Sequence, residues 1–400
     1  MKDGKSIFTN VVISLFSVLI FLVASEVTIR IYLTGFASEL GFLRYASLHQ
    51  LEKRAKNDSL FSFKKSFHRY LGYFPTPNYR HGKNKHNSLG YRGDEIALPK
   101  PGDEFRIVCL GGSTTYSSGV EDYRHAYPEL LETELKSRGH GNVNVINAGA
   151  PGWSTWESLI NFEFRVLDLA PDMIIVYHAV NDIHPRFIWP PEAYRGDNSG
   201  RSLPNVTSVF MPSILEYSTL FRFFMIRLGV TLPHVDISRT VDRRADTFYG
   251  GDFQYQKMHK SYPKGIFKEV SAKQMLETNK PVYYRRNLES IVHIAQARGI
   301  TTVLATFAFS TLFEDQPRAS SKEYVSAYLQ HNQVMREIAQ ENDVYLFDFA
   351  NEFPADKQYF HDGRHITFEG SRLKARLFAE FIVRHDLVTS PLTNPAKIVK

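Results

Sequence analysis

The chain is poor in cysteine, because its 400 residues contain only Cys109. A single thiol excludes an intrachain disulfide framework and any zinc site built from several thiolates. Cys109 stands inside a short apolar run, where a free thiol serves as core packing. One thiol is compatible with any compartment, so it does not indicate where the protein resides.

Long runs of like charge are also missing. The 48 basic and 42 acidic residues are interspersed, although they leave a net charge of +6. Nucleic-acid-binding proteins concentrate their basic residues on one stripe or face, so we expect no nucleic-acid partner. No internal repeat or low-complexity segment is visible. Residues 111–119 contain neither G-x-G-x-x-G nor a P-loop lysine, which argues against a phosphate-binding loop. No cofactor is indicated.

Only one long hydrophobic run is present, from Ile7 to Ala24. At about 1.5 Å per residue this run nearly spans a bilayer, and extension to Leu33 completes the span. Val23-Ala24-Ser25 also suits a signal-peptide cleavage site, but the length of the run favours an uncleaved anchor. A short tail before a large domain usually stays inside, so we predict a single-pass protein with its bulk on the extracytoplasmic side.

From residue 101 onward, short apolar β-branched runs alternate with amphipathic stretches of helical period. Such alternation predicts a five-stranded parallel sheet covered by helices on both faces, an α/β three-layer sandwich. The predicted strands are 106–110, 143–147, 172–178, 301–306 and 344–348. The predicted helices are 126–138, 154–169, 281–298, 321–341 and 367–385.

These patterns divide the chain into five parts. We predict a tail and membrane anchor (1–33), a stalk and domain lead-in (34–100), a catalytic domain (101–182 and 281–388), an insertion (183–280) and a C-terminal tail (389–400). The insertion is too long for a structureless loop and suits a lid or a substrate-binding region. Within it, Ser218 to Val230 reads as an apolar helix. We expect it to be buried against the domain, with a position on a membrane surface as the alternative.

The first predicted strand ends in Gly111 and Gly112, which deliver Ser113 to the carboxyl edge of the sheet. Ligands bind at this edge in open α/β sheets, beside the positive end of the following helix. A serine there can act as a nucleophile if a base and an oxyanion site come from elsewhere. The alternative is a serine that merely caps the helix.

The next two strands end in polar or glycine-rich turns. Gly152 closes one such turn and could offer its backbone N–H to an oxyanion, or could simply end the strand. Asn181 follows the third strand and could donate its side-chain amide into the cleft, or cap the next segment. His178 and His184 lie near Asn181 in the sequence, and we interpret both as residues lining the site.

Asp362 and His365 stand three residues apart on a turn after the fifth strand. That spacing can bring the carboxylate to one imidazole nitrogen while the other nitrogen faces the cleft, as in a Ser-His-Asp triad. His361 and His365 are four apart and could instead bind a metal. No further ligand cluster is evident in the sequence, so we predict no metal.

Together these blocks resemble the SGNH (GDSL-type) hydrolase family over about 105–182 and 281–385. The resemblance implies that Ser113 attacks, that His365 is the base and that Asp362 orients it. It also implies an oxyanion hole made of the Ser113 N–H, the Gly152 N–H and the Asn181 side chain. Gly112 stands where many members have Asp, and Ala179 where Gly is common; neither change removes a catalytic group. Thr115 replaces the last glycine of the α/β-hydrolase elbow, Gly-x-Ser-x-Gly, which argues against that fold.

The expected activity is that of a serine esterase that works through an acyl-enzyme. The resemblance implies O-acetyl groups on surface glycans, or lipid esters, as substrates. An O-acyltransferase with the same triad, and a catalytically idle glycan-binding or assembly protein, are the alternatives. The sequence does not indicate an oligomeric state.

Overall fold

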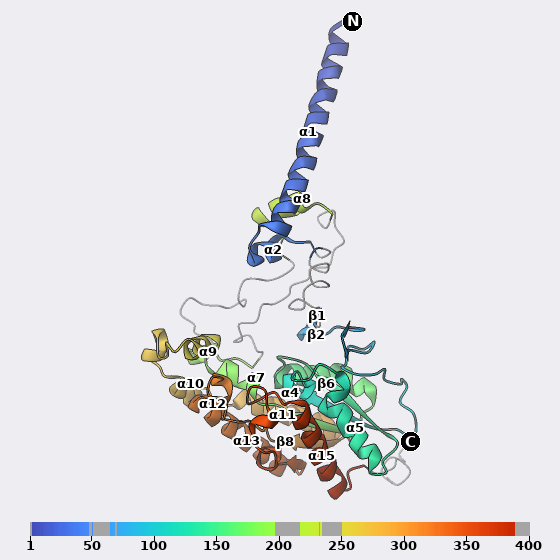
Figure 1. Cartoon of the computed structure of the whole chain (residues 1–400), viewed down its shortest axis with the longest axis vertical. Helices are drawn as coiled ribbons and strands as arrows, with labels where there is room; N and C mark the ends of the chain where they lie inside the picture. Colours follow the sequence, from blue (N-terminus) through green and yellow to red (C-terminus); the bar gives the residue numbers. More distant parts are fainter. Residues whose placement is uncertain are drawn as a thin grey trace. The chain divides into compact units, whose positions relative to one another are not determined.

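The structure, a computed structural model, describes residues 2–47, 50, 65–68, 70–196, 217–231, 233 and 250–388 (Figure 1). Its contacts divide the chain into two units. The first comprises Met1–Phe67 and Leu203–Val241, and the second comprises His68–Ser202 and Asp242–Lys400. The predicted C-terminal tail, 389–400, lies outside the described residues. The two units are described in turn.

The second unit is built on a parallel five-stranded sheet in the order β6-β5-β7-β8-β9. The strands are β5 (Phe105–Gly111), β6 (Val143–Gly149), β7 (Met173–Tyr177), β8 (Thr301–Ala305) and β9 (Tyr345–Phe347). In the central strand, Cys109 lies opposite Asn147 of β6 and Ile175 of β7. All five strands were predicted within two residues, and the predicted fold class is confirmed.

Alternate residues of β5 face opposite sides of the sheet, as the period of two requires. Ile107 and Cys109 join one hydrophobic cluster together with α5 and α15. Val108 and Leu110 join the other cluster together with α6, α11 and α13. The helices are α5 (Tyr127–Ser137), α6 (Thr155–Asn161), α11 (Val282–Ala297), α13 (Lys322–Glu341) and α15 (Phe368–Arg384). Both faces are therefore covered, which gives the three predicted layers.

Local signals in the sequence set several helix boundaries. Ser154 and Glu157 form a capping box at the start of α6, which satisfies two otherwise free backbone N–H groups. Thr367 caps α15 through a bond from the Gly370 N–H. The predicted helix 154–169 is not a continuous α-helix, because a π turn (Phe162–Val166) and a 3-10 turn follow α6. A π turn takes one extra residue, so the sequence period there departs from that of an α-helix.

Shorter elements complete this unit. The lead-in contains β2 (Gly72–Pro75), β3 (Arg80–His81) and β4 (Asn84–Lys85), after β1 (Lys65–His68) at the unit boundary. Beside the sheet lie α4 (Ser113–Tyr116), α7 (Val180–Ile183), α9 (Gly250–Met258), α10 (Ala272–Thr278), α12 (Pro317–Ser320) and α14 (Phe349–Glu352).

The first unit consists of a long helix, α1 (Lys2–Gly35), with α2 (Glu39–Tyr45) and α8 (Thr219–Arg227). Residues Ser6–Gly35 of α1 are long enough to cross a membrane, and the most apolar stretch of 18 residues within them has a mean hydropathy of 2.6. In the part of the chain that the structure describes, no other helix meets these criteria. Helix α8 packs against α1 and α2, so the segment 183–280 is shared between the two units.

Candidate active site

The turn after β5 depends on two glycines. A Cβ on Gly111 would lie 2.0 Å from Thr115 Oγ1 and 2.6 Å from the Tyr177 carbonyl oxygen. A Cβ on Gly112 would lie 2.7 Å from Asn181 Nδ2 and 2.9 Å from the Trp153 carbonyl oxygen. Neither position has room for a side chain unless its neighbours move. The close turn places Ser113 at the first position of α4, at the carboxyl edge of the central strand.

Ser113, His365 and Asp362 form a continuous chain of hydrogen bonds. Ser113 Oγ lies 2.8 Å from His365 Nε2, and His365 Nδ1 lies 2.8 Å from Asp362 Oδ2. Asp362 Oδ1 also accepts from the backbone N–H of His365 at 2.8 Å. The carboxylate therefore holds both the backbone and the ring of the histidine whose other nitrogen meets the serine.

The charge of Asp362 is stabilised by its neighbours. Burial raises the pKa of this carboxyl group. The hydrogen bond from His365 and the positive charge of Arg364 outweigh burial, and the pKa is lowered overall. The Arg364 guanidinium donates to Asp362 Oδ2 at 2.5 Å. Asp362 is therefore ionised at neutral pH, as a group that stabilises an imidazolium must be.

The two other sequence-predicted site residues lie beside Ser113. Asn181 is buried on α7, and its Nδ2 donates to the Trp153 carbonyl oxygen at 2.7 Å. Gly152, directly before Trp153, has a φ of +91°, which favours glycine. An amide Nδ2 carries two hydrogens, so the bond to Trp153 leaves one for another acceptor. The contacts of Gly112 with Asn181 and Trp153 bring these groups to the backbone on which Ser113 stands.

Asp182, the residue after Asn181, connects α7 to the start of α6. Asp182 accepts from the Thr155 backbone N–H at 3.0 Å and from the Thr155 hydroxyl at 2.5 Å. Asn287 of α11 donates to the same hydroxyl at 3.1 Å. These bonds fix the start of α6 relative to α7, and hence the turn that carries Gly152.

The two histidines near Asn181 are engaged elsewhere. His178 is only 2% exposed and hydrogen-bonds through Nε2 to the Ser158 hydroxyl at 2.7 Å. Burial lowers its pKa to about 3, so the ring is neutral. The expectation that His178 lines the site is wrong, because the ring points into the core. His184 is half-buried and bonds to the Tyr324 hydroxyl at 2.7 Å.

The geometry does not favour the metal alternative. Both ring nitrogens of His365 are engaged, and His361 Nε2 lies 2.9 Å from the Gly119 carbonyl oxygen. Within the described ranges, no group of three or more His, Cys, Asp or Glu side chains is arranged to hold a metal ion. The spacing of four between the two histidines therefore does not correspond to a shared ligand site.

Arg92 is a residue whose importance the sequence did not reveal. It is 2% exposed, and its guanidinium donates to the carbonyl oxygens of Tyr116, Ser117 and Val120 at 2.5, 2.9 and 2.8 Å. These carbonyls belong to the end of α4 and the loop that follows it. Arg92 thus positions the segment that begins with Ser113, from the lead-in segment, where it forms isolated β-bridges with His86 and Asn147. A basic residue in a turn-rich segment was the only signal.

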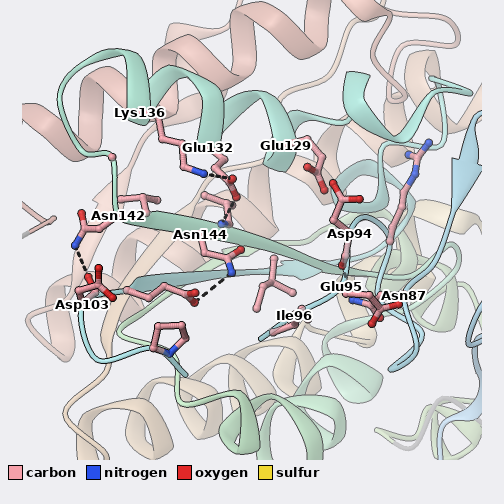
Figure 2. A pocket seen from close by; sticks show the side chains of 17 residues that line it. Asn87, Asp94, Glu95, Ile96, Asp103, Glu129, Glu132, Lys136, Asn142 and Asn144 are labelled. Carbon is pink, nitrogen blue, oxygen red and sulfur yellow. Dashed lines mark hydrogen bonds and ion pairs between the residues drawn. The ribbon is translucent and has the colours of Figure 1, made fainter. Parts of the chain in front are cut away.

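A separate hollow of about 370 Å³ lies between α5, β6 and the segment 87–104 (Figure 2). We call it the acidic pocket because Asp94, Glu95, Asp103, Glu104, Glu129 and Glu132 line it. Ser113, Asp362 and His365 are not among its lining residues. In Figure 2, Glu129 and Asp94 approach each other, and burial together with the nearby Glu132 and Asp94 carboxylates raises the pKa of Glu129 to about 8.

The fold is an α/β three-layer sandwich, and Ser113, His365 and Asp362 form a hydrogen-bonded chain at the carboxyl edge of its sheet. The profile of the GDSL-like lipase/acylhydrolase family matches residues 109–373. That range covers well over half of the chain, which therefore belongs to this family. Membership supports esterase or acylhydrolase activity.

Similar proteins include an uncharacterized lipoprotein of Bacillus subtilis, YqeF, which is 33% identical over 78 residues. The match covers 19% of this chain and 31% of that lipoprotein, so the chain spans less than a third of the length of this relative. Among solved structures, a lipase/acylhydrolase from Enterococcus faecalis is 16% identical with a TM-score of 0.41, covering 70% of this chain and 96% of that one. An acetyl xylan esterase from Geobacillus stearothermophilus is 13% identical with a TM-score of 0.40, covering 70% and 95%.

Proposed function

We propose that this protein is a membrane-anchored serine esterase that removes acyl groups, with O-acetyl groups foremost, from a surface glycan or a lipid. The observation that supports the proposal is the chain of two 2.8 Å hydrogen bonds that joins Ser113, His365 and Asp362. It lies at the edge of the sheet where an open α/β fold exposes its ligands.

In the proposed reaction, Ser113 Oγ attacks the ester carbonyl carbon while His365 Nε2 takes the hydroxyl proton. The negative carbonyl oxygen accepts hydrogen bonds from the Ser113 N–H, the Gly152 N–H and Asn181 Nδ2. The intermediate then breaks its bond to the alcohol oxygen, which leaves with the proton from His365. Asp362 stays ionised and stabilises the imidazolium throughout.

The acyl-enzyme is then resolved by a second attack. A water molecule gives one proton to His365 and adds its oxygen to the acyl carbon. Collapse releases the carboxylic acid and returns the proton to Ser113 Oγ. A sugar hydroxyl in place of water would transfer the acyl group instead, so an acyltransferase would use the same residues.

The proposed location follows from α1. Its apolar side chains between Ile7 and Val23 are exposed on all sides of the helix. A helix that is apolar all round is stable only when buried in protein or in lipid, which supports a membrane span. We place the catalytic unit on the extracytoplasmic side. The full chain should stay with membranes after an alkaline wash, and protease added outside should digest the catalytic unit. A soluble form beginning near Ser25 would contradict the anchor.

The activity is tested with the full-length protein in detergent micelles. Nitrophenyl esters of acetate, butyrate and octanoate would be compared, with Ser113→Ala as the matched control. We expect hydrolysis by the native chain, fastest for acetate, and a loss of about 10⁴-fold or more in the variant. Equal rates would refute the mechanism. Acyl transfer to an added sugar at a rate above that of hydrolysis would favour the transferase.

A further inference from the structure

Helix α8 and the membrane anchor are joined by an unusual cap. The carboxylate of Glu26, in α1, accepts hydrogen bonds from the Thr219 and Leu220 backbone N–H groups at 2.9 and 2.8 Å. It also accepts from the Ser218 hydroxyl at 3.0 Å. A carboxylate at this position satisfies free N–H groups and complements the positive end of the helix dipole. The N-terminus of α8 is therefore held beside Glu26 of α1.

Other contacts hold the same side of α8. Arg30 bonds to Glu26 at 2.5 Å and donates to the Tyr217 carbonyl oxygen at 2.7 Å. Arg222 is buried and donates to the Ala46 carbonyl oxygen at 3.0 Å. Phe223 and Ile226 pack on a small cluster formed by Leu33, Phe42, Tyr45 and Ala46. This inner side keeps α8 beside the carboxyl-terminal part of α1 and next to α2 (Figure 1).

The opposite side of α8 is apolar and exposed. Phe221, Phe224 and Leu228 are 46%, 52% and 72% exposed. At 100° per residue these positions fall on one face, away from Arg222 and Ile226. Large apolar side chains grouped on an exposed face indicate a binding site for a protein partner or a membrane. The sequence predicted burial of this helix; within its own unit only its inner side is buried, against α1 and α2.

The position of Glu26 along α1 indicates that the apolar face of α8 meets the membrane. Residues 7–25 of α1, at about 1.5 Å per residue, give a length close to the ~30 Å hydrocarbon core of a bilayer. If this stretch spans the membrane, and not the longer run to Leu33 that the sequence suggested, Glu26 lies where the hydrocarbon ends. The cap then places the start of α8 at the level of the lipid headgroups. Arg227 and Arg44, both exposed, lie in the same unit and suit anionic headgroups.

We propose that α8 is an interfacial helix whose Phe221-Phe224-Leu228 face enters the bilayer that α1 spans, with Glu26 as the residue that sets its depth. The proposal rests on the proposed anchor. Its consequence is that part of the segment 183–280 secures the membrane end of the protein. Such a helix buries its apolar face about 5–10 Å into the boundary between headgroups and acyl chains.

The test uses the full-length protein in vesicles of phosphatidylcholine and phosphatidylglycerol. Single cysteines labelled with an environment-sensitive fluorophore would replace Phe224, Val18 of α1, and Lys273, which is exposed on α10. The native Cys109 is buried in β5 and can remain in place. Nitroxide-labelled lipids quench only probes that enter the bilayer.

We expect the probe at Phe224→Cys to lose about half or more of its emission to nitroxides near the headgroups. The probe at Val18→Cys should be quenched by nitroxides deep in the acyl chains, and Lys273→Cys by neither. A quenched Val18→Cys with an unquenched Phe224→Cys would overturn the interfacial helix and leave the anchor intact. An unquenched Val18→Cys would refute the anchor and the interfacial helix with it.

Discussion

The carboxyl edge of the sheet and the acidic pocket both gather carboxylates, but they use them differently. At the sheet edge, Asp362 directs its charge through His365 toward a single hydroxyl group. In the acidic pocket, Glu132 is bonded to Lys136 and to the Val145 N–H, and Glu104 is bonded to Arg106 and Asn144. These two carboxylates are therefore already satisfied by neighbouring donors. The size of a hollow is a poorer guide to chemistry than the convergence of groups on one reactive atom.

The largest effect should come from removing the base at the sheet edge. His365→Ala removes the group that takes the proton from Ser113, so kcat should fall by about 10⁴-fold or more. Stability should change little, because His365 is only half-buried. Steady-state kinetics with a nitrophenyl ester would measure this effect.

The matched control is His361→Gln, four residues away. His361 meets the Gly119 carbonyl oxygen rather than the triad, so kcat should stay within about tenfold. Activity should also survive a strong chelator. A loss on chelation that zinc restores would revive a metal shared by the two histidines.

The next largest effect should come from Asn181. If its amide stabilises the oxyanion, Asn181→Ala should lower kcat by about 10²–10³-fold with little change in KM. Asn181→Asp keeps the shape but places an acceptor where negative charge develops, so this variant should fold and be nearly inactive. A melting temperature lowered with kcat intact would show instead that Asn181 only holds the Trp153 carbonyl oxygen.

The core of the second unit contains a buried lysine. Lys374 of α15 is 1% exposed, and its Nζ lies 3.5 and 3.8 Å from the ring centroids of Tyr177 and Tyr127. Burial lowers its pKa well below the usual value. Lys374→Met, which keeps the length and removes the charge, should raise the free energy of unfolding at pH 7 by about 1–3 kcal/mol.

The same lysine gives a signed pH dependence. Because the folded pKa is lowered, the unfolded chain binds more protons between that value and the unfolded value of about 10.4. This term therefore makes the native protein more stable as pH rises through the window. Denaturant titrations from pH 6 to pH 10 should show this rise reduced in Lys374→Met but not in Lys273→Met, which alters an exposed lysine.

The smallest effect on activity should come from the acidic pocket. Glu129→Gln should leave kcat and KM within about twofold, because the pocket and the triad share no residue. The folded pKa of about 8 exceeds the usual value of 4.5, so the native protein loses stability as pH rises between these values. The variant should lose less stability from pH 5 to pH 9, and Glu132→Gln is the control. A large loss of activity would make the pocket part of the reaction.

The sequence predicted best what depends on local pattern. Four of the five strands are buried along almost their whole length and bounded by turns, so their limits were clear. The spacing of Asp362 and His365 is local. Ser113 could be placed beside them because the residues that follow parallel strands meet at the carboxyl edge of the sheet. Contacts between distant residues were out of reach. Glu26 meets Thr219 across 193 positions, and Arg92 clamps the carbonyls after Ser113 from a segment that carries no catalytic motif. The burial of His178 was missed. His178 directly follows β7 at the carboxyl edge of the sheet, and a residue at that edge can still point into the core.

The central claim is that Ser113 is a nucleophile activated by His365. The most direct measurement is labelling of the full-length protein with a fluorophosphonate, followed by mass spectrometry of its peptides. We predict one modified residue, Ser113, with no modification in Ser113→Ala and much slower modification in His365→Ala. Equal labelling of the native chain and Ser113→Ala, or modification at another serine, would contradict the account.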